Sequence, residues 1–168
     1  SSEHCMSLLK SMRHRGSELK RFAFPTMEMT SELLGDLCDF LGVCGGLQFF
    51  GVFLGMYTYS EVKICCSKED VILFCGALQK CAHLEHLVIC LDHLDADDVA
   101  KAFQTALSSS SKLHTLELQL EYFPVGAARN LQQLMVRNQV RSLRSFTLKT
   151  RTKDLDPLYL VPAAIALS

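Results

Sequence analysis

Apolar residues return at the same spacing five times along the chain. In each copy a leucine is followed by apolar residues three and five positions later, which gives the pattern Leu-x-x-Φ-x-Φ, where Φ is apolar. Apolar residues at alternate positions are typical of a strand that is buried on one face. We therefore predict five strands, near residues 19–24, 47–53, 84–90, 113–119 and 143–149.

Between the copies the apolar spacing changes to that of a helix. The apolar faces that precede the second to fifth strands are Leu33, Leu34, Leu37, Cys38 and Leu41; Val71, Phe74, Cys75 and Leu78; Val99, Ala102, Phe103 and Ala106; and Ala128, Leu131, Leu134 and Met135. Ser67 followed by Asp70 resembles a capping box, and Pro124 and the aspartates within 95–98 suit the starts of two further helices. An amphipathic stretch from Cys5 to Met12 adds a helix before the first strand.

The copies are nearly evenly spaced. Their first leucines are 28, 37, 29 and 30 residues apart, and the long interval contains an insertion near residues 55–66. A strand followed by a helix, repeated at one period, predicts an α/β fold. We expect a single domain over residues 1–168, a solenoid with a parallel concave sheet of about five strands and outer helices.

On these five copies the sequence resembles the leucine-rich repeat family, in its ribonuclease-inhibitor-like class with repeats of about 28 to 29 residues. The resemblance covers about residues 5–149. The chain departs from the family pattern where Asn or Cys usually begins a backbone-bonding ladder after the strand, because the residues there are Met27, Gly55, Asp92, Glu121 and Arg151. We therefore expect an atypical member and a fragment of a longer protein, and the resemblance implies a surface that binds other proteins.

Charge and hydropathy exclude several kinds of partner. The net charge of -1 gives no bulk attraction to nucleic acid or to an anionic membrane. The longest apolar run, Leu47–Tyr59, is shorter than the roughly 20 residues of a membrane-spanning helix. We predict neither a nucleic-acid partner nor a membrane span.

The cysteines indicate a reducing compartment. The chain has 8 Cys, and Cys38, Cys75, Cys81 and Cys90 lie in apolar runs, where a thiol serves as a small buried side chain. No secretory signal opens the sequence. We therefore expect free thiols and a cytoplasmic protein.

Catalytic and metal chemistry find little support in the sequence. Cys81, His83, His86, Cys90 and His93 form the one candidate metal cluster. On a strand, His86 and Cys90 would lie about 13 Å apart, whereas two ligands of one zinc ion lie about 3 to 4 Å apart. We predict no metal, no cofactor and no enzyme activity.

The residues between the apolar positions are expected to line the concave face, since side chains alternate along a strand. Phe49, Phe53, Val88 and Cys90 would form an apolar patch there. Such a patch either binds a partner or is covered by the insertion or a flanking domain. The residues that we predict to bind a partner are Phe49, Phe53, His86, Val88, Glu117, Arg21, Arg144 and Lys149.

The sequence therefore predicts a non-enzymatic protein-protein interaction module that binds an unidentified protein on its concave face. Its basic ends, at Arg21 and at Arg144 with Lys149, either recognise an acidic segment or form a solvated rim. The alternatives are a GTPase-activating or other regulatory protein that uses a rim arginine, Arg21 or Arg144, and a substrate receptor of a ubiquitin ligase. A redox switch at Cys65 and Cys66 is a further hypothesis.

Overall fold

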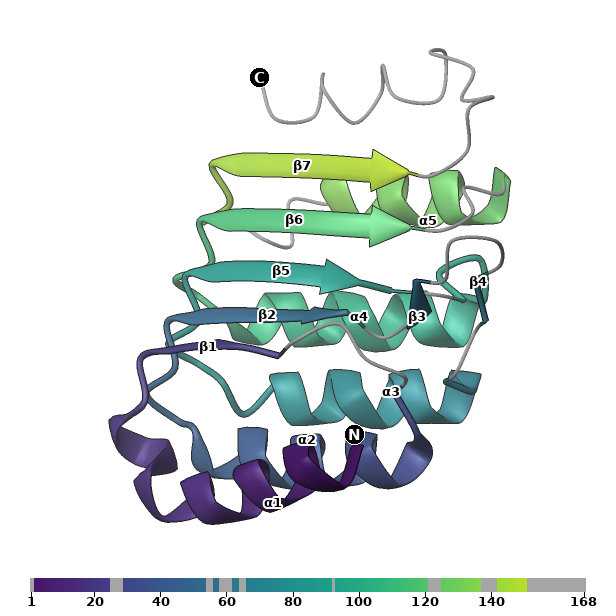
Figure 1. The fold of residues 1–168 in the computed structure, drawn as a ribbon. Coiled ribbons are helices and arrows are strands. Elements are labelled where there is room, and N and C mark those ends of the chain that lie inside the picture. The colour runs from purple at the N-terminus through teal and green to yellow at the C-terminus, as the bar shows by residue number, and fades with distance from the viewer. Residues whose placement is uncertain are drawn as a thin grey trace.

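A computed structural model gives the fold of the chain (Figure 1). The structure describes residues 2–24, 29–53, 56–57, 62–63, 66–91, 93–120, 125–136 and 142–150. Its helices are α1 (Ser2–Met12), the 3-10 helix η1 (Arg13–Glu18), α2 (Ser31–Val43), α3 (Lys68–Leu78), α4 (Asp97–Ser109) and α5 (Val125–Val136). Its strands are β1 (Arg21–Ala23), β2 (Phe49–Phe53), β3 (Met56–Tyr57), β4 (Val62–Lys63), β5 (His86–Cys90), β6 (Thr115–Leu120) and β7 (Ser145–Thr150).

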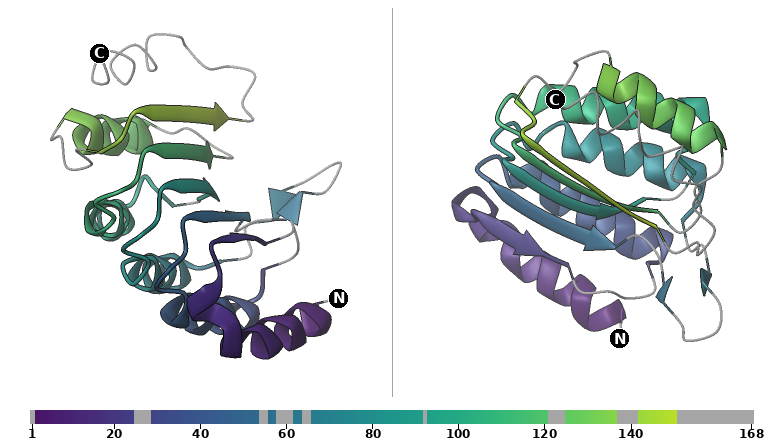
Figure 2. Two further views of the ribbon diagram at one scale, coloured as in Figure 1. Left: turned by 90° about the vertical axis from the view of Figure 1, so that its left-hand side faces the viewer. Right: turned by 90° about the horizontal axis from the view of Figure 1, so that it is seen from above.

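Five strands form one parallel sheet in chain order, β1-β2-β5-β6-β7. Helices α2 to α5 cover one face of this sheet, and α1 packs against α2 beyond β1 (Figure 1). The sheet is curved, with these helices on the outside of the curve (Figure 2). The predicted α/β class, with a parallel five-stranded sheet and outer helices, is confirmed.

The strands begin about two residues later than the sequence predicted. The first leucine of each copy lies in the turn before its strand. There the N–H of Leu47 donates to Cys44 O at 3.0 Å and the N–H of Leu84 donates to Cys81 O at 3.1 Å. Both leucines are buried. They keep the apolar pattern of a strand because they pack under the sheet, although their backbone still belongs to the turn.

The core lies between the sheet and helices α2 to α5. At the central template position Leu87 is 1% exposed and Leu116 is 0% exposed, as the apolar pattern predicts. The ring of Phe50 on β2 packs against that of Phe74 on α3, with the two centroids 6.1 Å apart. The five apolar triplets therefore form the sheet side of one continuous core.

The starts of the helices match the sequence signals where they are described. At α3 the Ser67 hydroxyl accepts from the N–H of Asp70, and the Asp70 carboxylate accepts from the N–H of Ser67, both at 3.1 Å. This is the predicted capping box. Helix α2 begins with a cap that the sequence analysis missed, in which Thr30 Oγ1 accepts from the N–H of Leu33 at 3.2 Å. Pro124 and the five ladder positions that depart from the family pattern lie outside the described residues.

A backbone ladder holds together the edge of the sheet where the strands begin. The carbonyl of Lys20 accepts from the N–H groups of Gln48 and Phe49, at 2.8 and 3.0 Å. The same pattern recurs at the next three steps, where the carbonyls of Gln48, Glu85 and His114 each accept from two consecutive N–H groups of the following turn and strand. These bonds satisfy backbone groups where β2, β5, β6 and β7 begin and hold the strands in one register. Two turns also use a side chain, since Ser110 Oγ donates to Cys81 O and Ser142 Oγ donates to Leu113 O.

The predicted insertion contains a second, two-stranded antiparallel sheet made of β3 and β4. These two strands stand at the carboxyl ends of the main strands and project forward of the face that helices α2 to α5 leave uncovered (Figure 2). We call the uncovered face the open face.

Buried thiols contribute to packing, as predicted. Cys38, Cys75, Cys81 and Cys90 are at most 7% exposed, and Cys38, Cys44, Cys75 and Cys81 are free thiols. Burial raises the pKa of Cys38 and Cys44 to about 11 and the pKa of Cys75 and Cys81 to about 12. Among the described helices, none is long and apolar enough to cross a membrane.

Candidate functional site

Two rows of side chains cross the open face because the parallel register aligns alternate residues of neighbouring strands. The first row runs from β1 to β7 through Arg21, Phe49, His86, Thr115 and Ser145. The second row contains Ala23, Gly51, Val88, Glu117 and Thr147. A third row follows at Phe53, Cys90, Gln119 and Lys149. Seven of the eight sequence-predicted site residues lie in these three rows, and the exception is Arg144.

Phe49 is the apolar centre of the first row. The guanidinium carbon of Arg21 lies 4.6 Å from the centroid of the Phe49 ring, in a cation-π contact. On the next strand, the His86 ring centroid lies 6.5 Å away. Phe49 is half-buried, whereas Arg21 and His86 are exposed. The ring is therefore oriented by two neighbours and still presents part of its surface to solvent.

Gly51 explains how the Phe49 ring fits on the strand. A Cβ atom built on Gly51 would lie 3.6 Å from Phe49 Cε1 and 3.8 Å from Ala23 Cβ. The ring thus leans along β2 over a residue without a side chain, and Gly51 is buried beneath it. Gly51 was not among the residues predicted from the sequence, although a glycine inside a strand often marks a close approach of this kind.

The apolar patch is smaller than the sequence predicted. Val88 on β5 is half-buried and belongs to the open face, in register with Gly51. Cys90, which was expected to share the patch, is only 5% exposed and so offers a partner almost no surface. Phe53 pairs with Cys90 in the register of the sheet, but its side chain lies outside the described atoms.

Glu117 and Lys149 form an ion pair at the other end of the face. The Lys149 ammonium donates to Glu117 Oε1, and the Gln119 amide donates to the same oxygen at 3.0 Å. These two hydrogen bonds, the one from Lys149 being the stronger influence, hold the pKa of Glu117 below its usual value. Lys149 was predicted to bind a partner at a basic end of the face, and the structure pairs its charge with the carboxylate on the neighbouring strand.

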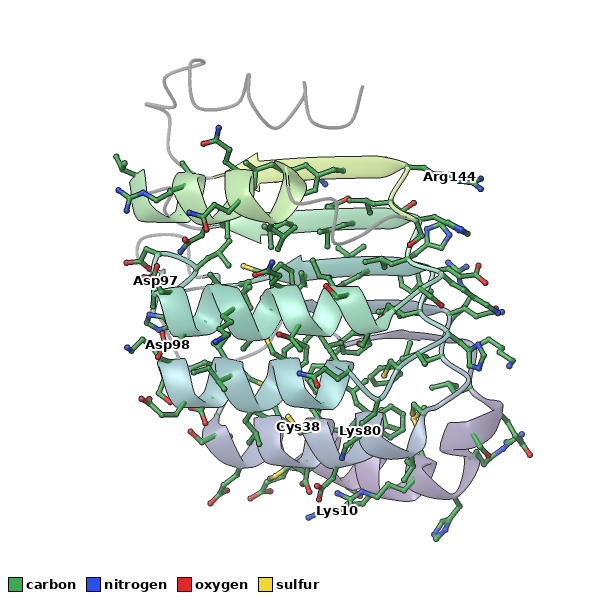
Figure 3. The ribbon with its side chains drawn as sticks, turned by 180° about the vertical axis from the view of Figure 1, so that it is seen from behind. Lys10, Cys38, Lys80, Asp97, Asp98 and Arg144 are labelled. Carbon is green, nitrogen blue, oxygen red and sulfur yellow. The ribbon has the colours of Figure 1, made fainter. Side chains whose placement is uncertain are left out.

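Arg144 does not lie on the open face, where the sequence analysis placed it. It precedes β7 and projects from the edge of the sheet where the strands begin (Figure 3). Lys20 holds the equivalent place before β1, since the carbonyls of Lys20 and His114 occupy matching steps of the backbone ladder. The error arose because a residue directly before a strand was assigned the alternation of the strand itself.

The candidate metal cluster is not assembled within the described part of the chain, where no group of three His, Cys, Asp or Glu side chains is placed to hold a metal ion. His93 Nε2 instead donates to Cys66 O at 3.0 Å. Of the vicinal pair, Cys66 is 3% exposed, and Cys65 lies outside the described residues.

No family model matches the sequence, and a search of curated proteins finds no match. Solved structures with the same arrangement do exist. The actin-binding site 2 domain of leiomodin-1 is similar over 95% of this chain and 84% of its own, with a TM-score of 0.64 and 11% identity. The C-terminal domain of tropomodulin from Caenorhabditis elegans is similar over 99% of this chain and 91% of its own, with a TM-score of 0.59 and 11% identity. At this identity the likeness shows the fold alone.

These comparisons correct the assignment to the leucine-rich repeat family. The similar structures are leiomodin and tropomodulin domains rather than ribonuclease-inhibitor-like proteins, and no family model matches. The spacing Leu-x-x-Φ-x-Φ arises because each strand buries the face that packs against the helices. Parallel α/β packing requires this in general, in any family. The spacing therefore predicted the sheet correctly but was wrong as evidence for a family. The similar structures do not support the predicted leucine-rich repeat solenoid.

Proposed function

We propose that this chain is a non-enzymatic protein-binding domain whose partner docks on the open face of the sheet, centred on Phe49. The observation that carries the proposal is the placement of this aromatic ring, half-buried between Arg21 and His86 on a face that the described helices leave uncovered. Aromatic and arginine side chains held in this way are the residues that dominate the binding energy of protein interfaces.

The neighbours of Phe49 favour a preformed site. Arg21 and His86 hold the ring from adjacent strands, and the backbone ladder fixes those strands in register. Val88 extends the apolar surface toward Glu117, whose carboxylate is held by Lys149 and Gln119. A partner that binds here loses little free energy to the ordering of loops or side chains, because these groups already have fixed neighbours.

The partner that we propose is actin. The support for this choice is the likeness to the leiomodin-1 domain, which is described as an actin-binding site. A cytoplasmic location suits this proposal, and the free thiols at Cys38, Cys44, Cys75 and Cys81 are compatible with a reducing compartment.

Co-sedimentation with actin filaments, together with a binding assay on actin monomers, tests the proposal. Phe49→Ala combined with Phe53→Ala should weaken binding by about 2 kcal/mol, which is roughly thirtyfold in Kd. The matched control is Leu73→Ala, since Leu73 is a large apolar side chain that is 56% exposed on α3, on the helical side of the molecule. This control should bind like the wild type.

Two results would overturn the proposal. If the wild-type chain binds neither filaments nor monomers, actin is not the partner. If the Phe49 and Phe53 double variant binds as tightly as Leu73→Ala, the open face is not the site. The melting temperature of each variant must be measured alongside, because a large loss of stability at Phe49 and Phe53 would mean that these rings pack under the insertion instead of facing a partner.

A further inference from the structure

We infer that the partner presents an acidic polypeptide segment to the amino edge of the sheet, defined as the edge where the strands begin, with its cations Lys20, Arg21, Lys112 and Arg144. This inference rests on the proposed function, because it names the chemistry of a partner that also covers Phe49. Arg21 also contacts Phe49, but Lys20, Lys112 and Arg144 lie outside the Phe49 site, and the two ideas are tested with different ligands, so they can fail separately.

The charges of the described residues are divided between two opposite edges of the molecule. Negative charge gathers where α2, α3 and α4 begin, with acidic side chains in the first turn of each helix. Asp97 and Asp98 mark this edge, and Arg144 projects at the opposite one (Figure 3). The cations of the amino edge are exposed, and within the described ranges none of them forms an ion pair with a carboxylate.

Among the other described cations, those beside a carboxylate are paired with it, whereas the exposed Lys80, Lys101 and Arg129 form no ion pair within the described residues. Lys10 and Arg13 bind Asp36, Arg15 binds Glu18, and Lys68 binds Asp98. On the open face, Lys149 binds Glu117. Two described carboxylates lie near this edge, that of the half-buried Glu85 before β5 and that of Glu18 before β1, and Glu18 is paired with Arg15. The edge therefore keeps a net positive charge on a chain whose total charge is -1.

Compensation of helix dipoles explains only part of this division. Carboxylates at helix amino termini and cations at helix carboxyl termini are stabilising without any partner. Lys80 follows α3 and its amine lies 3.6 Å from a Cβ built on Gly42, near the end of α2, so the dipole accounts for it. Lys20 is accounted for in the same way, since its amine lies 3.1 Å from a Cβ built on Gly46, just after α2. Arg21 lies on β1 and Arg144 directly before β7, and strands have only small net dipoles. Their gathering at one edge requires another explanation.

The spacing of these cations fits a polypeptide segment. Lys20 and Arg21 belong to the β1 end and Arg144 to the β7 end, four strand spacings away, which is roughly 19 Å at about 4.8 Å per spacing. An extended segment of about six residues covers this distance. Such a segment would run across the strands, with Arg21 placing one cation directly beside the Phe49 anchor.

A protein partner is favoured over a single-stranded nucleic acid. Nucleic acid would use Phe49 as a stacking platform for a base, which needs an uncovered face of the ring. Here one side of the ring carries the Arg21 guanidinium, and the ring edge packs against Gly51. The acidic edge of the molecule also repels a long polyanion that would bind well to a domain of uniformly positive charge.

The experiment uses a fluorescein-labelled peptide of about eight glutamates, with a glutamine peptide of the same length as its control, and follows fluorescence anisotropy at low and at physiological salt. The test variant combines Arg21→Glu with Arg144→Glu. Its matched control combines Lys101→Glu with Arg129→Glu, which makes the same change in net charge on the outer, exposed sides of α4 and α5. Arg21→Gln with Arg144→Gln provides a milder variant in case charge reversal prevents folding.

We expect the glutamate peptide to bind the wild type at least tenfold more tightly than the glutamine peptide, and salt to weaken this binding. The edge variant should lose at least tenfold in affinity, whereas the helix control should lose less than twofold. Equal losses in both double variants, equal binding of the two peptides, or tighter binding of an oligouridine of the same charge would each overturn the inference.

The outcome is separable from that of the proposed function. Failure of the glutamate peptide, with actin binding still dependent on Phe49, would remove only the acidic-segment inference. Peptide binding at the amino edge, with actin binding unaffected by Phe49→Ala and Phe53→Ala, would instead remove the open face as the actin site.

Discussion

Phe49 and Phe50 are neighbours in the chain and differ completely in what surrounds them. The ring of Phe50 is 0% exposed and lies within 6.2 Å of the Phe22 ring and 6.1 Å of the Phe74 ring, measured between centroids. Phe49 is half-buried on the opposite face, between Arg21 and His86. The two faces of β2 therefore differ in role. Its core-facing residues stabilise the fold, and its open-face residues remain available for binding.

The sharpest way to break this comparison is to truncate each ring in turn. We expect Phe50→Ala to cost about 3 to 5 kcal/mol of unfolding free energy, because it leaves a cavity in a close-packed aromatic cluster. Phe49→Ala should cost about 1 kcal/mol, mainly through loss of the contact with Arg21. Chemical denaturation of both variants measures the difference, and similar costs would show that Phe49 is also a core residue.

The same division can be tested on β5 and the turn before it. Leu87 is 1% exposed, and we expect Leu87→Ala to cost about 2 to 5 kcal/mol. Glu85→Ala, a change at a half-buried residue just before the strand, should stay within about 0.5 kcal/mol. Thermal melts that gave the reverse order would contradict the assigned register.

A smaller effect is expected from the ion pair on the open face. Glu117 and Lys149 are bonded, and the Lys149 side chain is 56% exposed, so a double-mutant cycle with Glu117→Gln and Lys149→Met should give a coupling of about 0.2 to 1 kcal/mol at pH 7. The folded-state pKa of Glu117 lies below its usual value. The coupling should therefore be fully present above the unfolded-state pKa and be lost as the pH falls through the folded-state pKa. A coupling that grew on acidification would exclude this pair as its source.

The smallest effect concerns the thiols on the core side. Only the thiolate reacts, and burial raises the pKa of Cys75 and Cys81 to about 12. We expect the melting temperature to be the same with and without reductant, and iodoacetamide to modify Cys38, Cys75 and Cys81 only when the chain unfolds. Peptide mass spectrometry with a urea-unfolded control measures this. Rapid labelling of the native chain, or a mass deficit of two or more disulfides, would contradict it.

The sequence was sufficient for the sheet because burial leaves a periodic trace. The leucines and phenylalanines of the five copies are constrained to one face, and the structure confirms Leu87 and Leu116 in the core. The capping box at Ser67 was predicted for a similar reason, since both of its hydrogen bonds are local in the chain.

The site could be predicted only in part, because open-face residues obey no periodic constraint. The alternation placed Phe49, His86 and Val88 on the correct face, but the pairing of Lys149 with Glu117 depends on strand register, which joins residues 32 positions apart. The position of Arg144 depends on where the turn ends and the strand begins, and apolar spacing does not mark that boundary. Nor could spacing alone identify a family.

The most direct test of the open face as a binding surface is methyl NMR on the chain labelled at valine and leucine, titrated with monomeric actin. Val88 on the open face and Leu87 on the core face are adjacent in β5, and Leu73 reports on the helical side. We predict that actin shifts or broadens the Val88 methyl signals and leaves those of Leu73 unchanged. Shifts at Leu73 or at the exposed Val125, with Val88 unaffected, would contradict the open face as the binding surface.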